Sequence, residues 1–246
     1  MRLLGRHIQL AVRTKALRPP PSRPDHLQNQ LYKAIKPRPY SLSSSPNMPE
    51  SISRDPLVWI DCEMTGLDYD NDTILSFACF VTDYDLNLLE PNGYEAIIRH
   101  SKAELDAMGE WCRQHHGKSG LTAACLASST TAEMAAEGLL EYVKKYAPER
   151  RRALLAGNTV QADRAFLRKP PYDTVVKHLH HRILDVSAIK EAARRWAPVE
   201  VLKKSPQKKG AHEARQDILE SIEEARYYRN IFFRQNKDNA EQGGGS

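Results

Sequence analysis

Two carboxylates lie close together in an otherwise apolar part of the sequence. Asp61 and Glu63 are two residues apart within PLVWIDCEM, residues 56–64. Successive side chains of a strand point to opposite faces, so both carboxylates belong to one face of a predicted strand. Like charges at this spacing repel each other and are costly to remove from water. The pair indicates either a face that is open to water or a site where cations neutralise the charge.

Three further residues could join this pair. Asp163 follows the short apolar segment ALLAGN at the expected start of a helix, where α/β folds often bind ligands, although an Asp there can also cap the helix. His212 and Asp217 open the last expected helix. Five residues correspond to about 500° of rotation, so the two side chains point about 140° apart but can both line a cavity at that end. A lone His there can equally be a surface residue.

Four carboxylates from three segments, with one histidine, match the chemistry of phosphodiester hydrolysis. Hard divalent cations such as Mg²⁺ take oxygen ligands. Two such ions about 3.5–4 Å apart can hold the attacking and leaving oxygens of an in-line displacement. A histidine with a pKa of about 6.5 can accept a proton from the attacking water.

The surrounding elements predict an α/β layer fold with a mixed sheet. Apolar runs predict strands over 56–64, 73–83 and 94–99, which form an antiparallel meander. Later segments alternate between helix and strand. We expect helices over 102–116, 131–147 and 162–169, a short buried strand over 153–158, a strand leading into a helix over 183–196, and a long helix over 212–234.

The charge is unevenly distributed along the chain. The net charge is +5, but residues 1–49 hold nine basic residues and one acidic residue, which leaves 27 bases and 30 acids in the remainder. The basic start is amphipathic and followed by a Pro- and Ser-rich stretch, the pattern of a mitochondrial transit segment. We therefore expect residues 1–55 to be a disordered basic leader that directs the protein to mitochondria. A basic tail without an address is the alternative. Met48 could start a second form that stays in the cytoplasm or nucleus.

Other features narrow the class of protein. The four cysteines include no Cys-x-x-Cys pair, which suits a reducing compartment. Cys62 and Cys79 lie in apolar, strand-like runs and are predicted to be small buried side chains. The sequence has no apolar run of about 18 residues, so we expect no membrane association. Residues 235–246 end in GGGS and predict a flexible tail.

Five segments together resemble the oligoribonucleases, a branch of the DEDDh 3′–5′ exonucleases. They are WIDCEMTGLD (59–68), EWCRQHHGKSGL (110–121), LAGNTVQADRAFL (155–167), HHRILDVSAIKEAARRW (180–196) and ARQDILESIEEARYYRN (214–230). The resemblance implies a three-layer RNase H-like exonuclease domain over residues 56–234, with a mixed sheet flanked by α-helices. It also implies two Mg²⁺ or Mn²⁺ ions held by Asp61, Glu63, Asp163 and Asp217, with His212 as the general base.

The same resemblance implies the residues that hold the substrate. Leu67 would stack on a base and Trp111 would line the base pocket, although both could instead be core residues. Thr159, Arg182 and Ser187 would cap the 5′ phosphate, with a surface ion pair as the alternative role of Arg182.

Three positions depart from the family's pattern. His181 stands where the family has a Tyr that packs on a base in the partner subunit's site, and a His ring stacks more weakly. Gln216 replaces the first Asp of a D-D-I run. Ser76, in the second expected strand, stands where the family has a Glu. None of the three removes a metal ligand or the base.

The expected activity is 3′-to-5′ hydrolysis of very short RNA, two to five nucleotides long, to nucleoside 5′-monophosphates. The part of the chain after residue 49 has more acids than bases. This charge suits a substrate that is held by its ends better than a long polymer, which needs an extended basic groove. Short single-stranded DNA stays open as a further substrate, and a homodimer is expected because the 181–187 segment acts across subunits. One alternative is a DEDDh exonuclease that acts on the 3′ ends of longer RNA or DNA. Another is a nuclease-fold module that binds without catalysis.

Overall fold

The computed structural model describes residues 55–207 and 213–233. The chain divides into two units, Met1–Asn47 and Met48–Ser246, and all described residues belong to the second. The predicted leader up to residue 54, His212 and the predicted tail lie outside the described residues. Among the described residues, no helix is both long enough and apolar enough to span a membrane.

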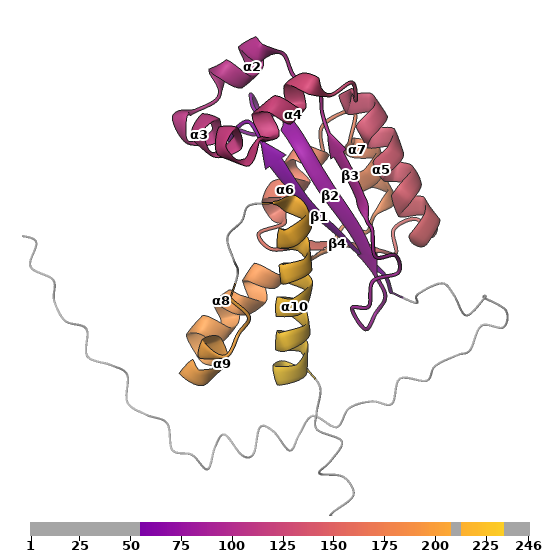
Figure 1. The fold of residues 1–246 in the computed structure, drawn as a ribbon. Coiled ribbons are helices and arrows are strands. Elements are labelled where there is room, and N and C mark those ends of the chain that lie inside the picture. Colours follow the sequence, from indigo (N-terminus) through magenta and orange to yellow (C-terminus); the bar gives the residue numbers. More distant parts are fainter. Residues whose placement is uncertain (1–54, 208–212, 234–246) are drawn as a thin grey trace, which may run out of the picture. The chain divides into compact units, whose positions relative to one another are not determined.

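A mixed five-stranded sheet forms the centre of the described unit (Figure 1). Its strands are β1 (Leu57–Met64), β2 (Ile74–Thr82), β3 (Tyr94–Ile97), β4 (Leu154–Gly157) and β5 (Ile183–Asp185), in the order β3-β2-β1-β4-β5. β1 and β2, and β2 and β3, pair antiparallel, whereas β4 pairs parallel with both β1 and β5. The predicted meander and mixed sheet are therefore confirmed.

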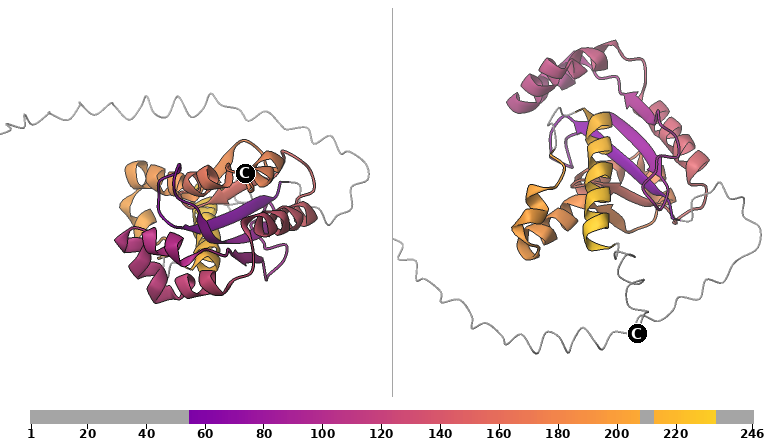
Figure 2. Two further views of the ribbon diagram at one scale, coloured as in Figure 1. Left: turned by 90° about the horizontal axis from the view of Figure 1, so that it is seen from above. Right: turned by 60° about the horizontal axis from the view of Figure 1, so that its bottom comes forward.

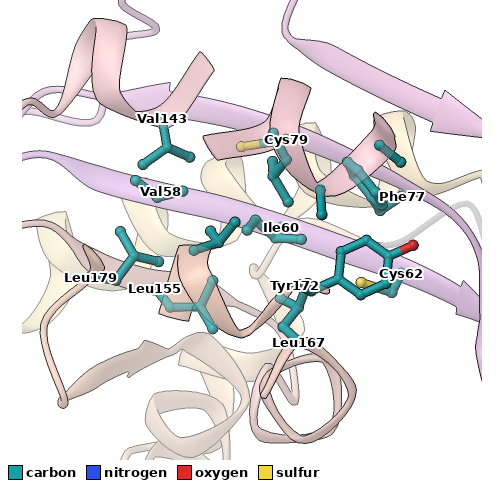
Figure 3. Close-up of a cluster of buried hydrophobic side chains, with 14 of the residues drawn as sticks. Val58, Ile60, Cys62, Phe77, Cys79, Val143, Leu155, Leu167, Tyr172 and Leu179 are labelled. Atoms are coloured by element: carbon teal, nitrogen blue, oxygen red, sulfur yellow. The ribbon is translucent and has the colours of Figure 1, made fainter. Parts of the chain in front are cut away.

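Helices cover both faces of this sheet, which gives three layers (Figures 1 and 2). One face packs against α5 (Ala132–Tyr146), α6 (Gln161–Leu167) and α7 (Asp173–His178). Val58, Ile60 and Cys62 of β1 point into this layer, together with Phe77 of β2 and Val143 of α5 (Figure 3).

The opposite face packs against α8 (Val186–Trp196) and α10 (Ala214–Phe232). Trp59 of β1 lies in this second layer with Ile218 and Ile222 of α10, and its indole N–H donates to Thr82 Oγ1 at 3.0 Å. β1 thus alternates between two cores, which is why its face assignment is unambiguous.

The region after β3 differs from the prediction. Instead of one helix over 102–116, the chain forms α2 (Lys102–Ala107) and α3 (Glu110–Ser119), followed by α4 (Leu121–Ala127). Met108 has an extended ψ of 152° and Gly109 caps α3. Burying Met108 against Leu105 and Cys125 stabilises this break. The short helices α7 and α9 (Val199–Lys203) were also not predicted.

Candidate active site

The end of β1 brings three of the predicted carboxylates together. Asp61 and Glu63 continue the face of Trp59, and α10 packs across that face with Asp217 in its first turn. Each residue offers an oxygen such that all three oxygens lie within 4.8 Å of one another. All three side chains are partly buried. The predicted convergence of β1 and the last helix is thus observed.

Asp163 approaches the same place from the other side of β1. It lies in the first turn of α6 and is only 6% exposed. Its Oδ1 accepts the backbone N–H of Cys62 at 2.9 Å, and Cys62 is the residue between Asp61 and Glu63. Asp163 is therefore attached to the strand that carries the other carboxylates, although it is not one of the three residues within 4.8 Å.

The pKa values reflect this crowding of negative charge. Burial, with the charges of Asp61 and Asp217, raises the pKa of Glu63 to about 8. Burial also raises the pKa of Asp163 to about 7, although the Cys62 N–H opposes the shift. Carboxylates that are partly buried and repel one another are stabilised by a divalent cation, and an all-oxygen set suits Mg²⁺ or Mn²⁺. The acidic cluster is therefore suited to binding metal.

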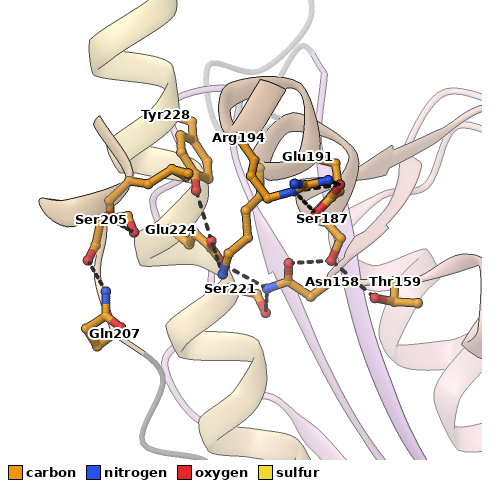
Figure 4. Close-up of polar contacts among 12 residues, drawn as sticks. Asn158, Thr159, Ser187, Glu191, Arg194, Ser205, Gln207, Ser221, Glu224 and Tyr228 are labelled. Carbon is orange, nitrogen blue, oxygen red and sulfur yellow. Dashed lines mark hydrogen bonds and ion pairs between the residues drawn. The ribbon is translucent and has the colours of Figure 1, made fainter. Parts of the chain in front are cut away.

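Thr159 and Ser187 are also brought together, 28 residues apart in the chain. Their hydroxyl oxygens lie 3.1 Å apart, and Ser187 Oγ donates to Asn158 Oδ1 at 3.0 Å (Figure 4). Asp185 Oδ1 accepts the backbone N–H of Thr159 at 3.0 Å and that of Ser187 at 2.9 Å. Thr159 is held with a positive φ of 55°. These bonds make a hydrogen-bonded polar cluster between β4 and the start of α8.

Leu67 and Trp111 lie at the surface, so their alternative assignment as core residues is wrong. Leu67, in the loop after β1, is 73% exposed, and Trp111, in α3, is 64% exposed. The Trp111 indole stacks on the His115 ring, with 4.8 Å between centroids and an angle of 6°. His115 therefore covers one face of the indole.

His181 and Arg182 lie in the turn before β5 and are exposed. The rings of His180 and His181 lie 4.2 Å apart, and Arg164 Nη2 donates to the His181 carbonyl at 3.3 Å. Within the part of the chain that the structure describes, the Arg182 side chain forms no ion pair, so the surface ion pair considered as its alternative role is not observed.

Sequence comparisons decide the family. A family model described as "Exonuclease" matches residues 58–225. A probable oligoribonuclease of Schizosaccharomyces pombe is 45% identical over 186 residues, which cover 76% of this chain and 72% of that protein. The mitochondrial oligoribonuclease of Homo sapiens is 45% identical over 74% of this chain and 75% of its own length. The oligoribonuclease of Leifsonia xyli is 48% identical over 74% and 86%.

This chain belongs to the oligoribonuclease family. Solved structures agree on the fold: exonuclease I of E. coli bound to a dT13 oligonucleotide superposes with a TM-score of 0.54 at 15% identity, over 76% of this chain and 46% of that one. At this identity the match shows the fold alone, a mixed sheet of the exonuclease I and RNase H-like type, as predicted. This chain spans less than half the length of that exonuclease.

Two departures from the oligoribonuclease pattern have visible consequences. Ser76 is paired with Glu63 across β1 and β2, so a Glu at position 76 would add another carboxylate beside Glu63. Gln216 Nε2 donates to Glu220 Oε1 at 3.1 Å along α10. The side chain of Gln216 is therefore held by its own helix, next to Asp217 in sequence.

Several residues of this oligoribonuclease site were not predicted. His116 is 2% exposed, and its Nε2 lies 3.0 Å from the Met64 carbonyl, which fixes the strand end after Glu63. Burial lowers the pKa of His116, which favours a neutral ring. Asn158 and Glu224 were also missed. Asn158 lies inside the AGN segment beside Thr159, which was the available signal. For Glu224 the signal was the helix period, which puts it about 100° from the apolar Ala225, against about 160° for Glu223.

Proposed function

We propose that this oligoribonuclease removes nucleoside 5′-monophosphates from the 3′ ends of RNAs two to five nucleotides long. The observation that carries the proposal is the convergence of Asp61, Glu63 and Asp217 within 4.8 Å, linked through Ser221 and Asn158 to the Thr159–Ser187 pair. One group can hold the scissile end of a short substrate and the other its phosphorylated 5′ end.

In this proposal Asp61, Glu63, Asp163 and Asp217 hold two Mg²⁺ or Mn²⁺ ions. When bound, the ions lower the pKa of water and stabilise the leaving 3′ oxygen. The four carboxylates would fix the positions of the ions, through which the reacting phosphate is oriented, and His212, outside the described residues, accepts the proton of the attacking water.

The proposed substrate contacts use side chains with different chemistry. Trp111 and Leu67 are exposed apolar groups that can stack on and wedge between bases. Thr159 and Ser187 cap the 5′ phosphate together with the partner subunit's Arg182, and Thr159 is the hydroxyl that donates to it. His181 and Arg182, which are exposed, act in the site of the partner subunit of a homodimer.

The charge of the chain supports short substrates. Residues 50–246 carry 27 bases and 30 acids, whereas affinity for a long strand comes from many phosphate contacts to Lys and Arg. Short single-stranded DNA is a further proposed substrate.

We also propose the cellular location and the limits of the domain. Residues 56–234 form the exonuclease domain, residues 1–55 a mitochondrial leader, and residues 235–246 a tail. A start at Met48 gives a form for the cytoplasm or nucleus. The curated relatives include mitochondrial oligoribonucleases, and the leader has the acid-poor, basic composition of a transit segment.

The activity is tested with the full chain and a 5′-labelled RNA dinucleotide. Mn²⁺-dependent release of mononucleotides is expected, and Asp61→Ala should abolish it while thermal unfolding stays cooperative. Unchanged turnover in this variant would refute the proposed site. A wild-type protein that binds RNA without releasing mononucleotides would point to the binding module instead.

A further inference from the structure

Glu224 is a buried carboxylate outside the predicted site. It lies on α10, two turns after Asp217, and is 1% exposed. Its Oε1 lies 3.1 Å from Lys190 Nζ and accepts the Tyr228 hydroxyl at 3.3 Å, and its Oε2 accepts from Asn158 Nδ2 at 3.2 Å. A carboxylate this deeply buried is costly unless it is paired and hydrogen-bonded. Figure 4 shows it between Tyr228 on one side and Ser221 and Asn158 on the other.

The contacts of Glu224 determine which way the Asn158 amide points. A carboxylate that is ion-paired with Lys190 accepts hydrogen bonds and donates none. The amide nitrogen of Asn158 must therefore face α10, where it also donates to Ser221 Oγ at 2.8 Å. Ser221 in turn donates to the Asp217 carbonyl at 2.7 Å. The amide oxygen of Asn158 is left facing Ser187.

The orientation of the Asn158 amide determines which atom donates in the hydrogen bonds of Ser187 and Thr159. Ser187 Oγ donates its single proton to Asn158 Oδ1, so the bond between Ser187 and Thr159 has Thr159 as the donor. Thr159 is exposed; turning its proton toward a ligand gives up its bond to Ser187 but leaves the bonds from Ser187 to Asn158 and from Asn158 to α10 in place. Thr159 is thus the hydroxyl of the pair that donates to an incoming phosphate, whereas Ser187 keeps its proton on Asn158.

We propose that Glu224 is a positioning residue for the 5′ phosphate. Through Asn158 it orients Ser187 and Thr159, and through Ser221 the same amide is tied to the helix that carries Asp217. The inference rests on the proposed function, because it assumes that the Thr159–Ser187 pair binds a 5′ phosphate. The proposal adds that one series of hydrogen bonds, through Asn158 and Ser221, connects the residues proposed to bind the phosphate with the helix that carries Asp217.

The main test variant is Glu224→Gln. Lys190 attracts the side-chain oxygen of the glutamine. The glutamine nitrogen then faces the Asn158 nitrogen, and the Asn158 amide must turn over. The double variant Glu224→Gln with Asn158→Asp restores a donor–acceptor pair with the direction reversed, and keeps an acceptor for Ser187. Asn158→Ala leaves Glu224 paired with Lys190 and Tyr228 and serves as a second single variant. Glu223→Gln, which alters an exposed pair with Arg226, is the matched control.

The readout is the ratio of kcat/KM for a dinucleotide with a 5′ phosphate to that for the same dinucleotide with a 5′ hydroxyl. We expect Glu224→Gln and Asn158→Ala to lower this ratio about tenfold through KM, the effect of one disturbed hydrogen bond to a charged group. The double variant should recover most of the loss, and the control should not change it. Thermal unfolding establishes that each variant is folded.

Two outcomes separate the claims. If the wild type releases mononucleotides but Glu224→Gln and Asn158→Ala lower the rates for both substrates equally, or leave the ratio unchanged, the positioning role is wrong and the proposed function stands. If the wild type releases none from either substrate, the proposed function itself fails.

Discussion

Replacing Asp163 by Asn should stabilise the metal-free protein and inactivate the enzyme. The asparagine can keep the bond from the Cys62 N–H through its oxygen, while its NH₂ group takes the place of the second carboxylate oxygen. A metal ligand is lost and a buried negative charge is removed. If Asp163 only stabilised the start of α6, replacing it by Asn would instead lower the stability and leave the activity.

The size of the effect follows from the pKa of Asp163. That pKa is raised from 3.8 to about 7, and each unit corresponds to about 1.4 kcal/mol. Above pH 7 the charged form therefore costs the metal-free fold up to about 4 kcal/mol. Burying the amide offsets about 1 kcal/mol of the gain. We expect a net stabilisation of roughly 2–3 kcal/mol, or about 4–10 °C in Tm.

The assay is thermal unfolding at pH 7.5, first with a chelator and then with saturating Mn²⁺. Wild type should gain Tm with Mn²⁺, and Asp163→Asn should gain little while starting from a higher value. Asp173→Asn is the matched control, since Asp173 occupies the first turn of α7 and pairs with the exposed Lys177 instead of lying beside other carboxylates. A lower Tm of Asp163→Asn in chelator, or an undiminished response to Mn²⁺, would refute the reasoning.

Three further predictions address pH, the base pocket and the dimer. The pKa values of Glu63 and Asp163 are raised, so the folded protein binds more protons than the unfolded chain between about pH 4 and 8. The Tm in chelator should therefore fall from pH 5 to pH 8. Asp163→Asn should show a shallower fall, because one of the two groups is removed. Trp111→Ala should raise KM by roughly tenfold, the loss of one base stack, yet shift Tm by less than about 2 °C because the side chain is 64% exposed; Trp111→Phe should retain most of the affinity. Mixing inactive Asp61→Ala and Arg182→Ala proteins should restore activity through subunit exchange, because one site of the heterodimer keeps its own Asp61 and its partner's Arg182. No recovery in exchanged heterodimers would count against the shared site.

Residues with a simple periodicity were predictable from the sequence. The alternation of β1 placed Asp61 and Glu63 on one face, and the position of Asp217 in the first turn of the last expected helix made it a residue that could line a cavity at that end. The break at Met108 and Gly109 was not predictable, because it depends on burying Met108 with Cys125 of α4 and Leu75 of β2, which come from other parts of the sequence.

The contacts of Glu224 could not be predicted for a similar reason. Glu223 and Glu224 are adjacent and identical in type, but only Glu224 is buried. Its partners Asn158 and Lys190 come from segments 66 and 34 residues away. The contact between Thr159 and Ser187 came from family resemblance, because spacing alone says nothing about residues 28 positions apart.

The central claim is that the substrate is a very short RNA. It is tested most directly by the rate of mononucleotide release from a series of 5′-labelled RNAs, from two to twenty nucleotides, with Mn²⁺ and equal enzyme. We expect kcat/KM to be highest for two to five nucleotides and to fall steeply beyond them. Similar turnover of the dinucleotide and the twenty-nucleotide RNA would contradict the account and favour an exonuclease that acts on longer 3′ ends.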